Sequence, residues 1–379
     1  MIIQNANVWN HEDGSFYRAD ILIRDGIIAA IGDLSDTKDA CVVDADGKPV
    51  VPGFIDVHTH GGAGHDFVGC APENFHEMAR FYASHGVTSV MPTLASAPLP
   101  DMRAAAASLT AFQPAADEAD FCGVHMEGRY LNPTKKGAHA PSLLAPLCAE
   151  ELDCEEFRAC RALHITAAYE LDTDGSFAEA AKAIGATMGL GHTAATYEEA
   201  KAAEARGISS YTHLFNTMPP LHHRDGGTVC AALEGDRFAE LICDGIHIAP
   251  EMVRLAARMK GKEYLVLVSD SMEATDSCDG EYFIAGNPVI VKNGKALTPE
   301  GALAGSTLTL DVALRNLMAF TGMRLGDALC CLTVNPAKQV GVFDRIGSIE
   351  VGKQADLLIL SGEREPRVDA VILRGALRA

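Results

Sequence analysis

The sequence predicts an α/β fold, a (β/α)8 barrel joined to a small β-domain that both ends of the chain build. The chain has 379 residues, of which 48% are apolar, so it can bury a large core. Short apolar runs alternate with helix-like segments through the middle of the chain, as expected of parallel strands that helices cover. Both ends instead show short strands joined by turns.

The predicted barrel strands are continuously apolar, which is typical of strands buried on both faces. They are 53–57, 87–91, 121–126, 163–168, 187–190, 209–212, 241–243 and 264–269. Helical spacing of apolar residues predicts helices over 72–85, 178–184, 197–205 and 250–259. After the first of these, Gly86 is a stop signal. Eight strands separated by helices predict a closed barrel.

The two ends of the chain show the pattern of a β-domain. Strands are expected over 2–8, 20–24, 27–31, 355–360 and 368–373. Asp25-Gly26 lies between two of these strands and predicts a tight hairpin. We expect a small β-sandwich formed by residues 1–51 and 346–379, with the barrel formed by residues 52–345.

The composition argues against several classes of function. The net charge of −20 is opposite to that of proteins that bind nucleic acids through clustered basic residues. No apolar run approaches the ~18 residues that span a bilayer, and the first residues lack the features of a signal peptide. The 11 cysteines include no Cys-x-x-Cys pair and are expected to be reduced. We therefore expect a cytoplasmic protein without a nucleic-acid or membrane partner.

Polar residues occur where the predicted barrel strands end. His58 and His60 end the first strand, and their spacing of two places both on one side of an extended chain. Later strand ends carry single polar residues, namely Glu127, His192, His213 and Asp270. The carboxyl ends of barrel strands meet at one mouth, where active sites are built.

Each of these signals alone has an ordinary structural alternative. The histidines could be surface or core residues, and the two carboxylates could cap helices or turns. Their joint occurrence favours a metal centre, and histidine with carboxylate ligands suits Zn²⁺ or Fe²⁺. A metal lowers the pKa of bound water, and Asp270 would then act as general base and general acid.

Several motifs resemble a known family. Residues 51–60 (VPGFIDVHTH) and 347–357 (GSIEVGKQADL) resemble signatures of the amidohydrolase superfamily. Most of its members carry a modified lysine where this chain has Glu127. That departure, with the motifs at 125–128, 191–196, 212–218 and 303–306, resembles the N-acetylglucosamine-6-phosphate deacetylase family of that superfamily.

The resemblance implies a TIM barrel of the metal-dependent hydrolase type, with one or two divalent ions per subunit. The main metal would be held by Glu127, His192 and His213, and a second by His58 and His60. Asp270 would be the catalytic acid and base, with His139 near the reacting carbonyl. The implied reaction is hydrolysis of N-acetylglucosamine 6-phosphate to glucosamine 6-phosphate and acetate, in amino-sugar catabolism.

The resemblance also implies the residues that bind the sugar phosphate. They are Ala138, Asn216, Thr217, His247, Leu303, Ala304 and Gly305. Arg224 would reach the phosphate in the active site of the neighbouring subunit, which implies a homodimer. Without the resemblance, Arg224 would be read as part of a solvated loop.

The chain departs from the family pattern at a few positions. Arg129 stands where proline is usual, Asp225-Gly226 where Glu-Pro is common, and Glu273 and Asp276 where small or neutral residues are expected. Arg129 would either add a cation near the metal or form a surface ion pair with Glu273. These departures leave two alternatives open, a deacetylase of another sugar phosphate such as N-acetylgalactosamine 6-phosphate, and an inactive barrel serving as an assembly module.

Overall fold

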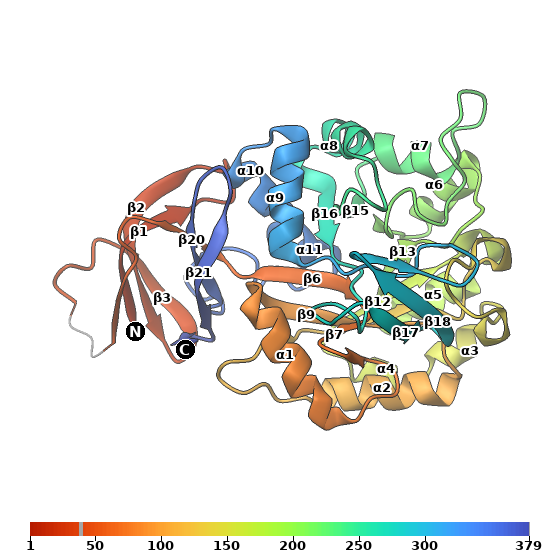
Figure 1. Cartoon of the computed structure of the whole chain (residues 1–379), viewed down its shortest axis with the longest axis horizontal. Coiled ribbons are helices and arrows are strands. Elements are labelled where there is room, and N and C mark those ends of the chain that lie inside the picture. The colour runs from red at the N-terminus through yellow and green to blue at the C-terminus, as the bar shows by residue number, and fades with distance from the viewer. Residues whose placement is uncertain (38–40, 379) are drawn as a thin grey trace.

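The computed structural model describes residues 1–37 and 41–378 and contains a barrel with a β-domain at one side (Figure 1). Neighbouring barrel strands are parallel and follow one another in chain order. They are β6 (Phe54–Thr59), β9 (Val87–Leu94), β11 (Val124–Glu127), β12 (Leu163–Ala167), β13 (Thr187–Leu190), β14 (Ser210–Tyr211), β15 (Phe238–Ile242) and β16 (Leu265–Val268). The amide of Asp270 donates to the carbonyl of His58 (2.9 Å), where β16 lies beside β6. Each predicted strand overlaps an observed one, so the predicted barrel is confirmed.

Helices cover the outside of the barrel and include the four that the sequence predicts. The longer ones are α1 (Phe75–Ser84), α2 (Leu99–Ala111), α5 (Ser176–Ala183), α6 (Tyr197–Ala205), α7 (Gly227–Glu234), α8 (Pro250–Tyr264), α9 (Leu310–Thr321) and α11 (Val334–Gln339). Shorter ones are η1 (Pro72–Asn74), η2 (Pro133–Lys135), η3 (Pro141–Leu143), α3 (Ala149–Leu152), α4 (Glu155–Arg158), η4 (Tyr169–Leu171), α10 (Leu325–Ala328) and η5 (Leu329–Leu332). None of the helices in the described part of the chain combines the length and apolar character needed to cross a membrane.

Helix α6 shows why the local sequence predicts these bounds so well. Thr196 precedes the helix, and its hydroxyl accepts a hydrogen bond from the amide of Glu199 (3.2 Å). The carboxylate of Glu199 accepts one in return from the amide of Thr196 (2.8 Å). This capping box satisfies two backbone donors that would otherwise lack partners, so the helix begins at Tyr197.

Both ends of the chain build the predicted β-domain. Its strands are β1 (Ile2–Trp9), β2 (Phe16–Arg24), β3 (Ile27–Gly32), β4 (Val42–Asp44), β5 (Pro49–Pro52), β20 (Leu357–Ser361), β21 (Arg367–Leu373) and β22 (Ala376–Leu377). They form one mixed sheet, which encloses an apolar core of its own. Asp25 and Gly26 have φ values of 49° and 75°, as the predicted hairpin requires. The domain limits 1–51, 52–345 and 346–379 remain a proposal, which this shared sheet supports.

An antiparallel sheet at the barrel mouth is absent from the sequence prediction. It consists of β17 (Gly280–Ile284), β18 (Asn287–Lys292) and β19 (Lys295–Leu297), and we call it the mouth sheet. Its turn at Ala285 accepts a hydrogen bond from the amide of Ala140 (3.3 Å). The mouth sheet therefore covers the loop that carries Ala138 and His139. The remaining short strands are β7 (Gly61–Gly62), β8 (His65–Asp66) and β10 (Asp120–Phe121).

Candidate active site

The structure brings the polar residues of the strand ends together at one mouth of the barrel. His58 lies on β6 and His60 directly follows it, while Glu127 is the last residue of β11. The others, His192, His213 and Asp270, each lie two positions after the last residue of β13, β14 and β16. All six are buried. This location agrees with the general observation that active sites of such barrels lie at the carboxyl ends of the strands.

Three of these residues have an unusual backbone conformation. His192, His213 and Asp270 have φ values of 48°, 31° and 49°, in the region that disfavours residues with a side chain. Such a conformation costs of order 1–3 kcal/mol at each residue, and it persists only where the surroundings hold it. Each of the three strands therefore ends in a sharp turn at the very residue that contributes its side chain to the site.

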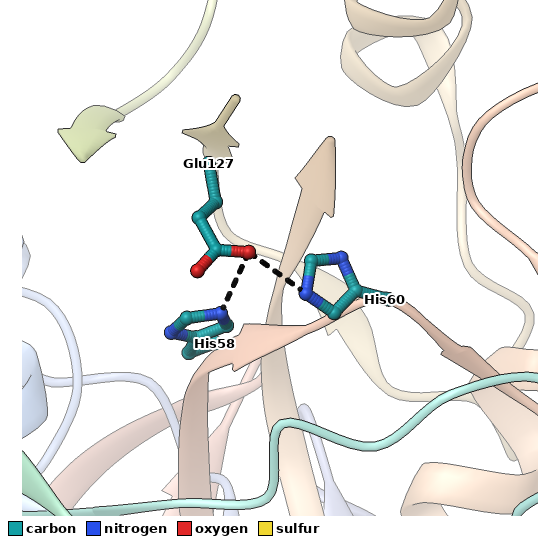
Figure 2. Close-up of side chains that lie close together, drawn as sticks. All are labelled: His58, His60 and Glu127. Carbon is teal, nitrogen blue, oxygen red and sulfur yellow. Dashed lines mark ion pairs between the residues drawn. The ribbon is translucent and has the colours of Figure 1, made fainter. Parts of the chain in front are cut away.

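Glu127 lies at the centre of the histidines. Its Oε1 is 3.1 Å from Nε2 of His192 and 2.9 Å from Nε2 of His213. Its Oε2 is 3.4 Å from Nε2 of His58 and 3.0 Å from Nε2 of His60, and Figure 2 shows both of these rings facing one carboxylate oxygen. One carboxylate thus has a separate pair of imidazoles at each of its oxygens. We call these five residues the Glu127 cluster.

Hydrogen bonds on the far side of two rings define which nitrogen carries the proton. Nδ1 of His58 is 2.9 Å from Oε2 of Glu240, and Nδ1 of His192 is 2.8 Å from the carbonyl oxygen of Lys135. A carboxylate and a carbonyl only accept hydrogen bonds, so both Nδ1 atoms donate. In the neutral rings, the Nε2 atoms therefore present lone pairs to Glu127, as metal ligands do.

His139 has the opposite arrangement. The amide of Ser96 donates to Nδ1 of His139 (3.3 Å), and the Ser96 hydroxyl lies 2.8 Å from the same nitrogen. That hydroxyl already accepts a hydrogen bond from the amide of Arg129 (2.9 Å), so its own proton is directed to Nδ1. With Nδ1 as the acceptor, the neutral His139 ring carries its proton on Nε2. His139 is thus arranged as a hydrogen-bond donor.

The site also concentrates negative charge. It contains the buried carboxylates of Glu127, Glu240 and Asp270, and no lysine or arginine among the described residues forms an ion pair with them. Burial acts to lower the pKa of His60, but hydrogen bonds to Asp270 and Glu127 outweigh it and raise that pKa to about 9. The carboxylates therefore draw positive charge into the site, as protons on histidine or as a metal cation.

The donor set fits a divalent cation. His58, His60 and Glu127 each offer a ligand atom within a group of metal-binding size. Nε2 of His58 has no hydrogen-bond partner, and Nε2 of His192 lies only 3.1 Å from Nε2 of His213. The lone pairs that His58 and His192 direct at this buried carboxylate repel it unless a proton or a cation lies between them. Histidine and carboxylate ligands in this number are typical of Zn²⁺ and Fe²⁺ sites.

The cluster lies in a cavity of about 250 Å³. Most of the side chains that the sequence singled out line it, namely His60, Glu127, Ala138, His139, His192, His213, Asn216, Thr217, His247, Asp270, Leu303 and Gly305. Three do not line it. His58 lies beneath Glu127, Ala304 is buried, and Arg224 is in an exposed turn outside the cavity.

The structure corrects the interpretation of Arg129. Its guanidinium pairs with Glu151, with Nε 3.2 Å from Oε2, and it does not line the cavity. Glu273 accepts a hydrogen bond from the amide of Phe283 (2.6 Å) in the mouth sheet. Neither expectation for Arg129 holds, because Glu151 lies within its reach and neutralises it. Arg129 instead contributes its amide to Ser96, which a proline could not do.

The sequence reasoning missed several residues of the cavity and its support. Ile284 and Ala285 of the mouth sheet line the cavity, as do Ala95 and Ala302. A signal for this sheet was present, since Asn293-Gly294 is a hairpin dipeptide between apolar runs and has φ values of 52° and 73°. Ser96 and Glu240 had no such signal, because their partners are distant in sequence.

Comparisons with known proteins show which family the chain is similar to. Residues 50–378 match the model of the amidohydrolase family. The chain is 35% identical over 352 residues to an N-acetylgalactosamine-6-phosphate deacetylase of Escherichia coli O157:H7, covering 92% of each. It is 33% identical over 341 residues to an N-acetylglucosamine-6-phosphate deacetylase of Vibrio furnissii, covering 89% of this chain and 85% of the relative.

A solved structure shows the same similarity. A mutant N-acetyl-D-glucosamine-6-phosphate deacetylase from Mycobacterium smegmatis, in complex with N-acetyl-D-glucosamine-6-phosphate, superposes with a TM-score of 0.87 at 28% identity. The match covers 100% of this chain and 99% of that one. The family model spans most of the chain, and the relatives match almost end to end. This chain therefore belongs to the amidohydrolase family.

Proposed function

We propose that this protein hydrolyses the acetamide of N-acetylglucosamine 6-phosphate, releasing glucosamine 6-phosphate and acetate. The observation that carries the proposal is the Glu127 cluster beside Asp270 and His139 in one cavity. Relatives with this activity, and a solved structure that holds this sugar phosphate, support the choice of substrate.

We propose that the Glu127 cluster holds one or two divalent metal ions, Zn²⁺ or Fe²⁺. Oε1 of Glu127 with His192 and His213 would bind the main ion, and Oε2 with His58 and His60 would bind a second. A divalent ion supplies Lewis acidity, which lowers the pKa of water and polarises an amide carbonyl.

Asp270 is the residue best placed to move protons in this reaction. Burial acts to raise its pKa, but the hydrogen bond from His60 and the charges of His58 and His60 lower it below its ordinary value. Asp270 is thus a carboxylate at neutral pH and can accept the proton of the attacking water. It then donates that proton to the departing nitrogen, which leaves as the amine of the sugar.

His139 supplies a hydrogen bond to the acetyl oxygen. Its ring lines the cavity, and Nε2, which carries the proton, lies 3.7 Å from Oε2 of Glu127. As negative charge develops on the acetyl oxygen, a fixed N–H donor at this place stabilises it. Ser96 keeps His139 in the required tautomer through the two contacts to Nδ1.

The sugar phosphate would lie against the remaining lining residues. Asn216, Thr217 and His247 offer polar groups on one side of the cavity, and the loop at Leu303 and Gly305 lies in its wall. Nδ1 of His247 is held by Asp244 at 2.7 Å, which leaves its Nε2 free for a ligand. Ala304 supports the loop from behind through a hydrogen bond from its amide to the carbonyl of Ala296 (3.2 Å).

Arg224 reaches no part of its own cavity, and we propose that it serves the neighbouring subunit of a homodimer. An arginine fork binds a phosphate in a bidentate manner. Arg224→Ala is therefore expected to raise KM for the phosphorylated substrate by about 10-fold or more, since hydrogen bonds between charged groups are worth about 1.5–3 kcal/mol. Steady-state kinetics with phosphorylated and unphosphorylated substrates measure this effect.

The matched control is Arg258→Ala, which removes an exposed arginine of α8. It should leave both KM values unchanged. If Arg224→Ala changes KM equally for phosphorylated and unphosphorylated sugars, Arg224 does not bind the phosphate.

N-acetylgalactosamine 6-phosphate is the second candidate substrate, because a relative of 35% identity bears that activity in its name. Comparing kcat/KM for both sugar phosphates, and for the unphosphorylated sugars, tests the proposal. Preference for N-acetylglucosamine 6-phosphate supports it, and preference for the galactose form would replace it. If the metal-loaded protein releases acetate from none of these sugars, the result would favour the alternative of an inactive barrel that serves as an assembly module. We also propose a cytoplasmic location, which the buried free thiols of Cys122, Cys243, Cys330 and Cys331 support.

A further inference from the structure

Glu240 is a buried carboxylate that the proposed reaction does not use. It lies on β15 with an exposed fraction of 0%, and it does not line the cavity. Its Oε2 accepts hydrogen bonds from Nδ1 of His58 (2.9 Å) and from the amide of His213 (3.2 Å). Its Oε1 accepts one from the side-chain amide of Gln339 (2.6 Å) on α11.

Burying the Glu240 carboxylate costs free energy, because it is removed from water. A buried charge normally requires a cation as a partner, and no lysine or arginine within the described residues pairs with Glu240. Its hydrogen bonds come instead from His58, His213 and Gln339. Two of these three partners belong to the Glu127 cluster, one from each pair of imidazoles.

The contact with His58 controls the ring. Because Glu240 only accepts hydrogen bonds, Nδ1 of His58 must donate, and Nε2 then faces Glu127 at 3.4 Å. If the His58 ring turned over, its Nδ1–H donor would lose Glu240 as acceptor and Nε2 would no longer face Glu127. A carboxylate behind a ligand histidine also increases the basicity of that ligand.

The contact with His213 acts on the backbone. His213 has a φ of 31°, a conformation that the surroundings must hold. The hydrogen bond from its amide to Glu240 stabilises this turn, which directs the imidazole towards Oε1 of Glu127.

We propose that Glu240 is a positioning residue for the metal centre, because it orients His58 through its ring and His213 through its backbone. The inference rests on the proposed metal site and adds to it a residue that contacts both imidazole pairs. Outer-shell partners of this kind typically contribute 10–100-fold in metal affinity.

Gln339 allows the charge and the hydrogen bonds of Glu240 to be tested separately. Its Oε1 is buried without a hydrogen-bond partner, so its amide group can turn over. In Glu240→Gln, the new carbonyl oxygen can still accept from His58, and the new amide can donate to Oε1 of Gln339. This variant loses the charge and keeps the hydrogen bonds, whereas Glu240→Leu loses both.

The experiment measures metal binding without reference to catalysis. Metal-free protein is titrated with Zn²⁺ in competition with a chromophoric chelator, and its thermal unfolding is followed in parallel. We expect the dissociation constant for Zn²⁺ to rise about 10-fold in Glu240→Gln and about 100-fold in Glu240→Leu. Excess Zn²⁺ should restore most of the activity of Glu240→Gln. The control is Glu118→Gln, an equally buried carboxylate that contacts His76 and Arg80 and no member of the cluster.

The outcomes separate this inference from the proposed function. Dissociation constants within about 3-fold of the unmodified protein in both Glu240 variants would overturn it, as would an equal loss in Glu118→Gln. If the unmodified protein binds Zn²⁺ tightly but releases no acetate from sugar phosphates, the proposed function fails and the role of Glu240 stands on the binding data.

Discussion

Glu127→Gln is expected to lower kcat/KM for deacetylation by at least ~10³-fold and to release the bound metal. Glu127 has two imidazoles at each of its oxygens, so an amide at this position leaves one pair with a neutral carbonyl oxygen and the other with an NH2 group that cannot bind a metal. Lewis-acid stabilisation is worth several kcal/mol, and each ~1.4 kcal/mol corresponds to a tenfold change in rate. Elemental analysis of the purified variant together with an acetate-release assay checks both parts of this expectation.

Removal of the metal from the unmodified protein provides the control for this variant. Dialysis against a chelator should abolish activity, and added Zn²⁺ or Fe²⁺ should restore it in the unmodified protein but not in Glu127→Gln. A variant that kept both its metal content and its turnover would exclude Glu127 as a ligand. The ion that restores the higher activity would also identify the preferred metal.

Asp270→Asn is expected to keep the metal and to lose at least ~10²-fold in kcat, the usual size of acid–base catalysis. The substitution preserves the shape of the side chain, and asparagine tolerates the φ of 49° at this position. It removes the carboxylate that accepts the proton of water and returns it to the leaving nitrogen. KM should change little, because the proposed substrate contacts lie on other residues.

Asp276→Asn is the matched change for this test. Asp276 follows the same strand, is exposed, and has a φ of 63°. It should retain normal kinetics, while metal content should be equal in both variants. Turnover of Asp270→Asn near that of Asp276→Asn would remove Asp270 from the mechanism.

The barrel and much of the candidate site are predictable from local patterns. Continuous apolar runs mark strands buried on both faces, and each run that the sequence shows became a barrel strand. Because the carboxyl ends of barrel strands meet at one mouth, Glu127 and the histidines are expected to lie together there, although they are dispersed along the chain. The hairpin at Asp25-Gly26 and the start of α6 were likewise predictable, because the residues that form them are neighbours in sequence.

Other features depend on contacts that no local pattern contains. Glu240 precedes the predicted strand 241–243 and carries no local sign of its role, yet it contacts His58, 182 residues away, and Gln339, 99 residues away. Ser96 and His139 are separated by 43 residues, and their contact decides which nitrogen of that ring is a donor. The exposed position of Arg224, by contrast, agrees with its local interpretation as part of a solvated loop.

The acidic, histidine-rich composition and the strand-end residues were enough to predict a barrel hydrolase with a metal centre. The tautomers of His58, His139 and His192, the position of Glu240 behind them and the sheet over the mouth depend on contacts between segments far apart in the chain. Which residue types meet at the mouth follows from apolar periodicity, which is local. The proton on each ring nitrogen and the direction of each carboxylate follow from hydrogen-bond partners, and only the closed barrel supplies those.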